Sequence, residues 1–288
     1  MRAIQILTLA GLLIAPASAF GSKTWSRTFQ AGGHPTVRVK TEDARVEVRA
    51  HDAKTVDVRV EAIGGVSGFS IGTLTPKVRI EERDGVIEVE VETHGVTAGL
   101  TISSLHYEVD IAVPPGCDLE AHTSDGSLTV DGLRGHVGVN SSDGHVTLTD
   151  LKGDVSIRTS DGPVVAEGID GRLEGTTADG TLRVKGRFDD LALQSTDGGM
   201  EVEVAPGSTL SDGWSLSTTD CGLRLVLPSA LKLTLDARVR DGSLDVDLDT
   251  GSSIQASDLH AVRMDLNGGG PVLKIRTSDG SVRIRGGS

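Results

Sequence analysis

Residues 123–132 read TSDGSLTVDG, and four tetrapeptides closely similar to its first four residues follow at one constant spacing. The copies are SSDG at 141–144, TSDG at 159–162, TADG at 177–180 and STDG at 195–198. Their aspartates therefore recur at one constant interval, at Asp125, Asp143, Asp161, Asp179 and Asp197. A fixed period of this length indicates a supersecondary unit that is repeated along the chain.

Each repeat contains two short runs in which apolar and polar residues alternate. In the first repeat the apolar positions are Leu128 and Val130, then Val137 and Val139, which is the pattern of strands with one buried face. A repeat of this length is too short to hold two strands and a crossover helix, so a recurring strand stacks most simply on its own copy. We therefore predict an all-β fold, a β-helix-like parallel β-solenoid with two-strand coils of roughly 18 residues.

The alternative fold is an antiparallel meander of hairpins that closes into a sandwich or barrel. Asp-Gly is a strong hairpin signal, which favours this alternative. Columns of like residues at one fixed spacing favour the solenoid. In either fold the turn itself has a structural explanation, because aspartate accepts hydrogen bonds from nearby backbone N–H groups and glycine adopts positive φ.

The repeat becomes weaker on both sides of the regular region. The segment 227–246 echoes 113–130, and TSDG returns at 277–280. STTDCGLRLVLP (217–228) resembles the same turn with Cys221 inserted between aspartate and glycine. Before residue 113 the alternation continues without the period, which predicts looser strands joined in part by a long loop over 63–76. No helix is predicted.

Residues 1–19 have the pattern of a secretory signal peptide. Arg2 provides a positive charge, an apolar run follows from Ile4 to Ile14, and Ala17-Ser18-Ala19 is a small-residue cleavage site. An uncleaved anchor is the alternative, but the apolar run is short for a membrane span. We expect an exported protein in the periplasm, on the cell surface or outside the cell, with no transmembrane segment in the mature chain.

The domain organisation follows from these patterns. We expect a signal peptide and one solenoid domain over 20–288, made of irregular strands at 20–112, regular coils at 113–204 and degenerate coils at 205–288.

Charge and composition restrict the partners. The chain has 28 Lys and Arg against 41 Asp and Glu, a formal net charge of −13, which argues against nucleic acid and against an anionic membrane. Aromatic residues make up only 2%, so the core must be built from Val, Leu and Ile.

Two cysteines, Cys117 and Cys221, could pair in an exported protein. If the chain climbs steadily, with coils about 4.8 Å apart, the two residues are separated by roughly 20–25 Å. A disulfide needs Cα atoms within about 7 Å. We expect two isolated thiols, and a bond only if the C-terminal segment folds back.

The exported signal, the entry segment VPPGCDLEAHTSDGSLTV (113–130) and the serial TSDG coils resemble the bacterial putative-adhesin domain family, a domain of unknown function. The resemblance covers most of residues 30–286 and is tightest from 109 to 204. It implies a β-solenoid at the cell envelope. It supplies no ligand residues.

The aspartate column has a functional interpretation beside the structural one. Five carboxylates at steps of about 4.8 Å could form a calcium ladder, and the period of roughly 18 residues is twice the nine-residue period of calcium-binding β-rolls. The chain lacks the second liganding carboxylate of those rolls, so the structural interpretation is favoured and no cofactor is expected. The adjacent hydroxyl column could form an ordered outer face or cap the turns: Thr123, Ser141, Thr159, Thr177 and Ser195.

Catalytic patterns are missing from the sequence. The eight histidines form no H-x-H or H-E-x-x-H motif, and there is no G-x-S-x-G motif. The large rings Trp25, Trp214 and Tyr107 are interpreted as core or loop plugs rather than sugar-stacking platforms. We expect no catalytic residues and a protein that is not an enzyme.

The predicted function is an exported, adhesin-like interaction protein that presents a polar, acidic side wall to an envelope protein or surface ligand. The outward positions expected to form this wall are Arg183, Lys185, Glu201, Glu203, Glu167 and Arg158. Two alternatives stay open. One is a purely architectural component that self-associates through its end coils. The other, weaker alternative is a carbohydrate-active enzyme on a β-helix.

Overall fold

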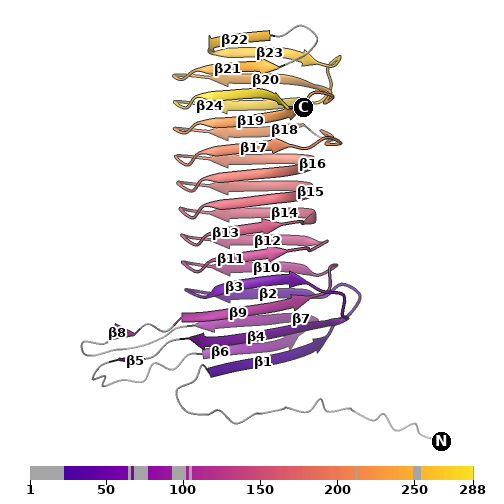
Figure 1. Cartoon of the computed structure of the whole chain (residues 1–288), viewed down its shortest axis with the longest axis vertical. Coiled ribbons are helices and arrows are strands. Elements are labelled where there is room, and N and C mark those ends of the chain that lie inside the picture. Colours follow the sequence, from indigo (N-terminus) through magenta and orange to yellow (C-terminus); the bar gives the residue numbers. More distant parts are fainter. Residues whose placement is uncertain are drawn as a thin grey trace, which may run out of the picture.

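The computed structural model describes residues 23–63, 77–92, 106–211, 213–248 and 260–287, and the backbone alone at 66–67, 102–103 and 254–259. The predicted signal peptide and most of the predicted loop over 63–76 lie outside these residues. The described chain contains strands and turns only, which confirms the all-β prediction. Twenty-three strands form one continuous sheet that is wound into an elongated stack (Figure 1).

Each coil has one strand that runs into a TSDG-type turn and one that leaves it, here called entry and exit strands. The entry strands are β2 (Thr36–Thr41), β10 (Asp118–Thr123), β12 (His136–Ser141), β14 (Lys152–Thr159), β18 (Trp214–Thr218), β20 (Leu233–Val239) and β24 (Val272–Thr277). The exit strands are β3 (Arg45–Ala50), β11 (Leu128–Asp131), β13 (Val146–Thr149), β17 (Met200–Val204), β19 (Leu223–Pro228), β21 (Leu244–Leu248) and β25 (Val282–Gly287).

Two longer strands serve as an exit strand and then as the entry strand of the next coil. These are β15 (Val164–Thr177) and β16 (Leu182–Ser195). The remaining strands lie at the ends of the stack or beside it: β1 (Lys23–Gln30), β4 (Thr55–Ile63), β5 (Val66–Ser67), β6 (Lys77–Arg83), β7 (Val86–Glu92), β8 (Ile102–Ser103), β9 (His106–Val113), β22 (Ile254–Leu259) and β23 (Ala261–Leu266).

The coils of the regular region stack in parallel, and like residues lie over like residues. Leu119 is paired with Val137, and Val137 with Val155, so paired residues are one sequence repeat apart. The exit strands follow the same register, with Leu128 beside Val146 and then Val164. These coils are therefore a parallel solenoid, and the meander alternative is wrong for them.

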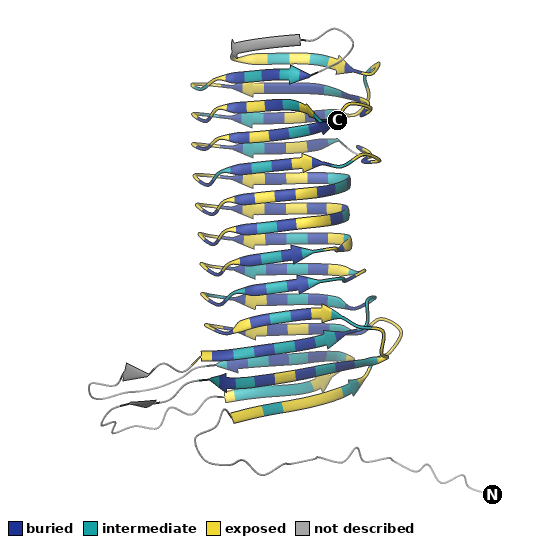
Figure 2. Cartoon of the chain, in the orientation of Figure 1, coloured by how far each residue is buried: buried dark blue, intermediate teal, exposed yellow. Residues whose placement is uncertain are grey.

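The core is a continuous set of aliphatic columns between the two strands of each coil. It extends from the strands β4 and β9 at one end to Leu266 on β23 at the other, with inward side chains buried and outward ones intermediate or exposed along most strands (Figure 2). Trp214, Tyr107 and Phe188 are the largest fully buried side chains. Phe188 and Trp214 meet edge to face, with ring centroids 6.2 Å apart. Trp214 and Tyr107 are therefore core residues, as predicted, whereas Trp25 on β1 is only partly buried against the core.

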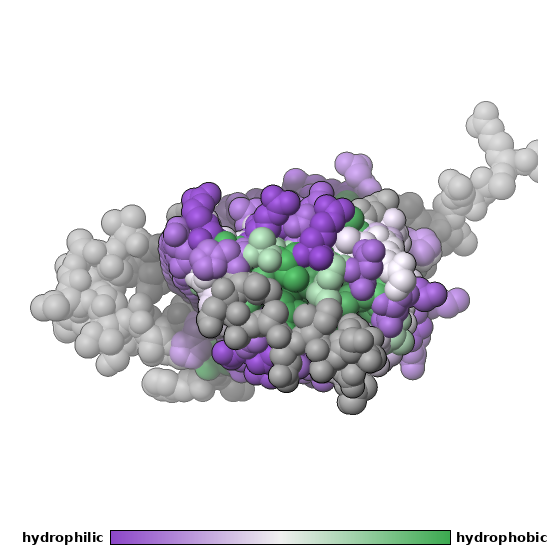
Figure 3. All heavy atoms as spheres, turned by 90° about the horizontal axis from the view of Figure 1, so that it is seen from above, coloured by the Kyte–Doolittle hydropathy of each residue, from purple (hydrophilic) through white to green (hydrophobic). Residues whose placement is uncertain are grey.

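Seen from the end that carries β23, hydrophobic atoms lie toward the middle of the stack and hydrophilic side chains form the rim (Figure 3).

The chain does not climb steadily at either end. At the N-terminal end, β2 lies between β7 and β10, and β3 lies between β9 and β11. This early coil is therefore inserted between strands that come later in the chain. At the C-terminal end, β24 lies between β18 and β20, and β25 lies between β19 and β21. The assumption of a steady climb is therefore wrong, because the last two strands fill a level that the chain had skipped.

Antiparallel pairs close both ends of the stack. β1 pairs with β4, β4 with β9, and β6 with β7 at one end. β23 pairs with β20, and β22 with β21, at the other. No helix within the described residues is long and apolar enough to cross a membrane.

Both cysteines are free thiols, as predicted, although the C-terminal segment does fold back. Cys117 lies just before β10, and its thiol donates to the Asp118 carbonyl oxygen at 3.2 Å. It is fully buried, and burial, followed by the charge of Asp118, raises its pKa to about 12.

We predict that Cys117 resists alkylation in the folded protein. Because the thiolate is the reactive form, a buried thiol with a pKa of about 12 reacts very slowly at pH 8. Iodoacetamide followed by mass spectrometry should leave Cys117 unmodified in native protein and modify both cysteines after unfolding in guanidinium. Rapid labelling of native Cys117, or a disulfide in the intact mass, would contradict this description.

Candidate binding surface: the turn column and the entry face

The TSDG turns stack into one column that is held together by the backbone. The N–H of Asp143 donates to Ser124 O at 2.9 Å, and Asp161 donates to Ser142 O at the same distance. Equivalent bonds continue in both directions, so nine aspartates share the column. In spatial order they are Asp43, Asp125, Asp143, Asp161, Asp179, Asp197, Asp220, Asp279 and Asp241.

The sequence placed five of these nine at a fixed spacing, and it showed Asp220, Asp241 and Asp279 in turns of the same kind outside that spacing. Asp241 and Asp279 are each followed by glycine, and Asp43 and Asp220 stand in TEDA and TTDC segments. The four lie outside the fixed spacing of the repeat, because the coils at both ends are inserted out of chain order. Asp43 alone was missed, because Ala44 takes the place of glycine in its turn.

The repeat glycines are required for space and not for positive φ, which corrects the sequence interpretation. None of Gly126, Gly144, Gly162, Gly180 and Gly198 has a positive φ. A Cβ built on Gly144 would lie 2.0 Å from Gly126 O, and one on Gly198 would lie 1.9 Å from Gly180 O. Real atoms do not approach so closely. The turns of the regular repeat can therefore stack at this spacing only because glycine has a hydrogen in place of a Cβ atom.

Cys221 occupies the glycine position of its own turn and is not an insertion. Thr218 is paired with Thr277 and Leu223 with Val282, so the two turns have equal length and Cys221 lies beside Gly280. Its sulfur lies 3.8 Å from Ser195 Oγ in the coil below. The column therefore accepts a small side chain in this turn, as it does at Ala44 in the turn of Asp43.

The hydroxyl column is buried inside the turns. Ser195 Oγ donates to Gly198 O at 2.7 Å, Thr177 Oγ1 donates to Ser160 O at 3.2 Å, and Thr218 Oγ1 donates to Thr277 Oγ1 at 2.7 Å. These side chains are at most 8% exposed. An ordered hydroxyl surface is therefore wrong, and the hydroxyls cap turn carbonyls and connect neighbouring coils.

The column brings like charges together. Burial, followed by the negative charges of Asp161 and Asp197, raises the pKa of Asp179. Burial and the charge of Asp125 likewise raise the pKa of Asp43. Within the part of the chain that the structure describes, no group of three or more His, Cys, Asp or Glu side chains could hold a metal ion. The calcium ladder at Asp125, Asp143, Asp161, Asp179 and Asp197 stays a prediction, tested at the end of the Discussion.

We predict that Asp179→Asn stabilises the protein slightly at pH 7. Because the folded-state pKa of Asp179 is raised, the folded chain binds its proton more tightly than the unfolded chain, and the charged form destabilises the fold. The unfavourable contribution of Asp179 to the free energy of unfolding should therefore disappear as pH falls through this pKa. The stability advantage of the variant over the parent should disappear with it. Thermal melts from pH 7 to pH 3 measure the difference.

Asp170→Asn is the matched control with the opposite sign. Lys152 Nζ lies 2.9 Å from Asp170 Oδ2, and Lys152 and then Arg187 lower the pKa of Asp170. This carboxylate stabilises the fold above its unfolded-state pKa, and that stability is lost as pH falls through the folded-state pKa. Asp170→Asn should therefore be less stable than the parent at pH 7. Equal effects of the two substitutions would show that the column repulsion is absent.

The predicted outward positions lie on two faces, so they do not form one acidic wall. On the exit face, formed by the outer side chains of the exit strands, Arg183 Nε lies 3.1 Å from Glu201 and Lys185 Nζ lies 2.9 Å from Glu203. Glu167 is on this face too. Arg158 is on the opposite, entry face and lies 3.8 Å from Glu174. Exposed pairs of this kind contribute about 0–1 kcal/mol each.

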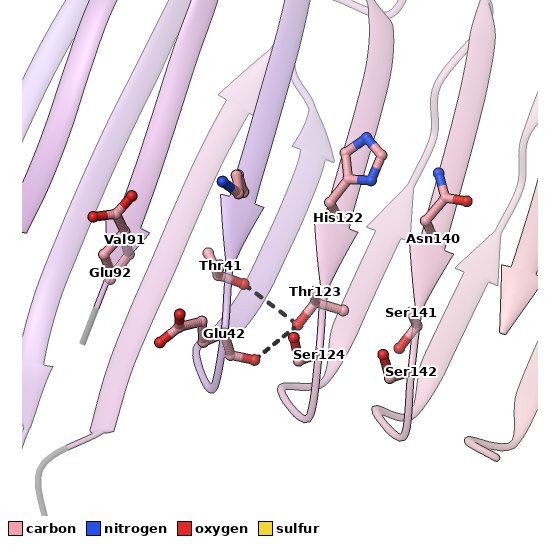
Figure 4. A pocket seen from close by; sticks show the side chains of 11 residues that line it. Thr41, Glu42, Val91, Glu92, His122, Thr123, Ser124, Asn140, Ser141 and Ser142 are labelled. Carbon is pink, nitrogen blue, oxygen red and sulfur yellow. Dashed lines mark hydrogen bonds between the residues drawn. The ribbon is translucent and has the colours of Figure 1, made fainter. Parts of the chain in front are cut away.

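The entry face carries a polar groove that the sequence did not predict. It lies where β2, β10 and β12 reach their turns, beside the end of β7 (Figure 4). We call it the N-terminal groove, and its volume is about 540 Å³. It is lined by Lys40, Thr41, Glu42, Val91, Glu92, His122, Thr123, Ser124, Asn140, Ser141 and Ser142.

Buried contacts fix the floor of this groove. Thr41 Oγ1 donates to Thr123 Oγ1 at 3.3 Å, and Thr123 Oγ1 lies 3.5 Å from Glu42 O. Lys40, His122 and Asn140 occupy equivalent outward positions in three successive coils. Sequence alone could not assemble this set, because β2 lies next to β10 only through the insertion of the early coil.

Comparison with protein families identifies the chain. The model of the Toastrack DUF4097 family matches residues 36–285. This chain belongs to that family. The matched region begins at β2 and ends within β25, so both inserted coils are part of the Toastrack region and β1 precedes it.

Three solved structures are similar to this Toastrack chain over most of its length, at low identity. A "putative lipid binding protein" from Parabacteroides distasonis is 11% identical, with 94% of this chain and 98% of that chain covered and a TM-score of 0.48. A "putative adhesin" from Parabacteroides merdae is 12% identical, with 94% and 98% covered and a TM-score of 0.44. A "putative cell adhesion protein" from Clostridium sporogenes is 10% identical, with 92% and 100% covered and a TM-score of 0.25. No curated protein matches the chain.

Proposed function

We propose that this Toastrack protein is exported and acts as a non-catalytic, adhesin-like binding protein at the cell envelope or outside the cell. The observation that carries the proposal is the N-terminal groove on the entry face. Its lining combines hydrogen-bond donors and acceptors, among them Lys40, Glu42, His122 and Asn140. A concave surface with converging polar groups is the usual form of a binding site.

The scaffold beneath the groove is suited to presenting a fixed surface. The inward side chains of β2, β10 and β12 are buried in the continuous core, which leaves the outward side chains at positions set by the strand register. Rigid elements preserve the spacing of groups that contact a partner and reduce the entropy lost on binding. The partner in this proposal is an envelope protein or a surface ligand with polar groups.

The architectural alternative is less well supported. The strands at the ends of the stack carry charges along their outer edges, for example Lys23 and Arg27 on β1 and Arg263 and Asp265 on β23. Charged edge strands oppose the pairing of one copy with the next.

Two measurements test the proposal. In the producing bacterium, a C-terminally tagged full chain should appear in the exported fraction with Phe20 as its first residue. Labelled residues 20–288 should then bind to the surface of those cells. A chain that stays in the cytoplasm with residues 1–19 attached would contradict export.

A pair of variants tests the groove itself. Asn140→Arg places a large charged side chain in the groove and should reduce cell binding about tenfold. Thr147→Arg, at a similarly half-buried outward position of β13 on the exit face, should leave binding unchanged. Equal binding by both variants would rule out the groove as the docking surface.

A further inference from the structure

The C-terminal end of the entry face carries a second, differently charged surface. Because β24 is inserted between β18 and β20, its outward side chains lie beside those of β20, and β23 continues the face. The cations gathered there are called the arginine patch: Arg238, Arg240, Arg263, Lys274 and Arg276. The patch stands out in a chain with a formal net charge of −13.

One carboxylate, Asp236, forms ion pairs with three of these five cations. Asp236 lies 3.1 Å from Arg276 Nη1, 3.4 Å from Arg238 Nε and 3.9 Å from Arg263 Nη1. It is only 7% exposed beneath them. Burial alone would raise the pKa of Asp236, but the three arginines, Arg276 foremost, lower it.

Much of the positive charge of the arginine patch is not neutralised by carboxylates of the described residues. Arg276 and Arg238 are neighbours in the register of β24 and β20, and like charges in such positions are destabilising. Arg240 makes no ion pair with any described residue. The nearby Asp265 accepts a hydrogen bond from Thr234 at 2.6 Å, and Asp220 and Asp279 of the turn column interact with each other.

A hollow of about 280 Å³ lies where these cations meet the ends of β18, β20 and β24. It is lined by Ser217, Thr218, Arg238, Val239, Arg240, Arg276, Thr277 and Ser278. Arg276 Nη1 donates to the carbonyl oxygens of Asp236 and Ile275, at 2.7 and 2.8 Å, which fixes this guanidinium in the wall of the hollow. Thr218 and Thr277 are bonded to each other, which leaves Ser217 and Ser278 to offer hydroxyl groups.

We propose that this hollow binds the phosphate group of a soluble or polymeric ligand. Three guanidinium groups beside two hydroxyls match an anion that carries more than one negative charge and several acceptor oxygens. An anionic bilayer is the less favoured source of the phosphate, because the acidic molecule as a whole is repelled from such a surface. The inference gives the proposed binding function a ligand class, and rests on that function only for its biological role.

The experiment is a calorimetric titration of residues 20–288 with inorganic phosphate at low ionic strength. Arg238→Gln and Arg240→Gln should each weaken binding about tenfold, whereas Arg224→Gln on the exit face should leave it unchanged. Asp236→Asn removes the competing carboxylate and should tighten binding several-fold, a gain that damage to the fold could not produce. Absence of phosphate binding, or binding that the patch variants do not change, would overturn the proposal.

Two further measurements are needed. One distinguishes a membrane from other sources of phosphate, and the other distinguishes this inference from the proposed binding function. Phosphatidylglycerol vesicles should retain no more protein than phosphatidylcholine vesicles, and patch-dependent vesicle binding without phosphate binding would replace this site with a membrane-contact surface. Cell binding is measured with the same variants. Phosphate binding by a protein that does not bind cells would contradict only the proposed function, and cell binding without phosphate binding only this inference.

Discussion

Gly198→Ala is expected to destabilise the protein by about 3 kcal/mol, whereas Gly199→Ala, at the next position, should change its stability very little. A Cβ on Gly198 would lie 1.9 Å from Gly180 O and 2.6 Å from the carbonyl carbon. Both belong to the backbone of the turn below, so the clash can be relieved only by separating two coils. A Cβ on Gly199 would meet nothing nearer than Thr181 Cγ2, at 4.0 Å.

Chemical denaturation and thermal melts of the two variants measure this difference. A loss of about 3 kcal/mol corresponds to a fall in Tm of roughly 6 °C or more. Gly199 does not have a positive φ, so alanine there also restricts the unfolded chain and could add a few tenths of a kcal/mol. Equal stabilities would mean that the turns are not stacked as closely as described. Cys221 and Ala44 show that two turns hold a side chain at the equivalent position, which makes the magnitude at Gly198 informative.

Deletion of residues 270–288 is expected to unfold the coil of β20 and β21 together with its cap. These residues form β24 and β25, which are hydrogen-bonded on both sides. Their buried side chains Leu273, Ile275, Val282 and Ile284 contribute about 6–12 kcal/mol by burial, which is comparable with the whole stability of an ordinary domain. In a repeat stack the coils below need only their own neighbours, so the chain up to β19 should stay folded.

Limited proteolysis with mass spectrometry tests this result. The truncated protein should be cut readily between residues 229 and 266, and protected fragments should end before β20. Deletion of residues 20–30 is the control, because among the described strands β1 pairs only with β4, and most of its side chains are exposed. The deletion of residues 20–30 should lower the free energy of unfolding much less than the deletion of residues 270–288. If the first deletion left a cooperative, protease-resistant stack through β21, then β24 and β25 would be a terminal coil and not an inserted one.

The regular coils could be predicted from sequence because their information is local and periodic. The alternation at Leu128 and Val130 gives the buried face, and the constant spacing of the repeat gives the parallel register. The pattern does not contain the order in which coils stack. From its place in the sequence, TSDG at 277–280 would be the last coil, yet it lies between the turns that follow Thr218 and Val239. The sequence does not reveal this order, because any coil of this design can pair with any other.

The turn chemistry was predicted only in part. The buried hydroxyls of Thr177 and Ser195 agree with the prediction that the turn is structural. The sequence interpretation, however, explained the glycine by a positive φ, because that is the commonest reason for glycine in a turn. A close approach between two backbones depends on the stack and cannot be read from one turn.

The two proposed binding surfaces were missed for the same reason. Lys40 and His122 are distant in the chain and are lined up only by the insertion of β2. The arginine patch likewise depends on the insertion of β24 beside β20. Where the outward positions lay within the regular region, as with Arg183 and Glu201, the sequence placed them correctly outside but did not show that they pair.

A thermal melt of residues 20–288 in calcium and in EDTA tests most directly the claim that the turn column shapes the stack rather than holding metal. Calcium at a hundredfold excess over its dissociation constant would add about 2.7 kcal/mol, a shift of several degrees. The structure leads us to expect coincident curves, because the column aspartates are all exposed to solvent, which screens the repulsion between their carboxylates. A higher Tm in calcium, lost on substitution of Asp161 by Asn, would contradict this account and make the column a metal ladder.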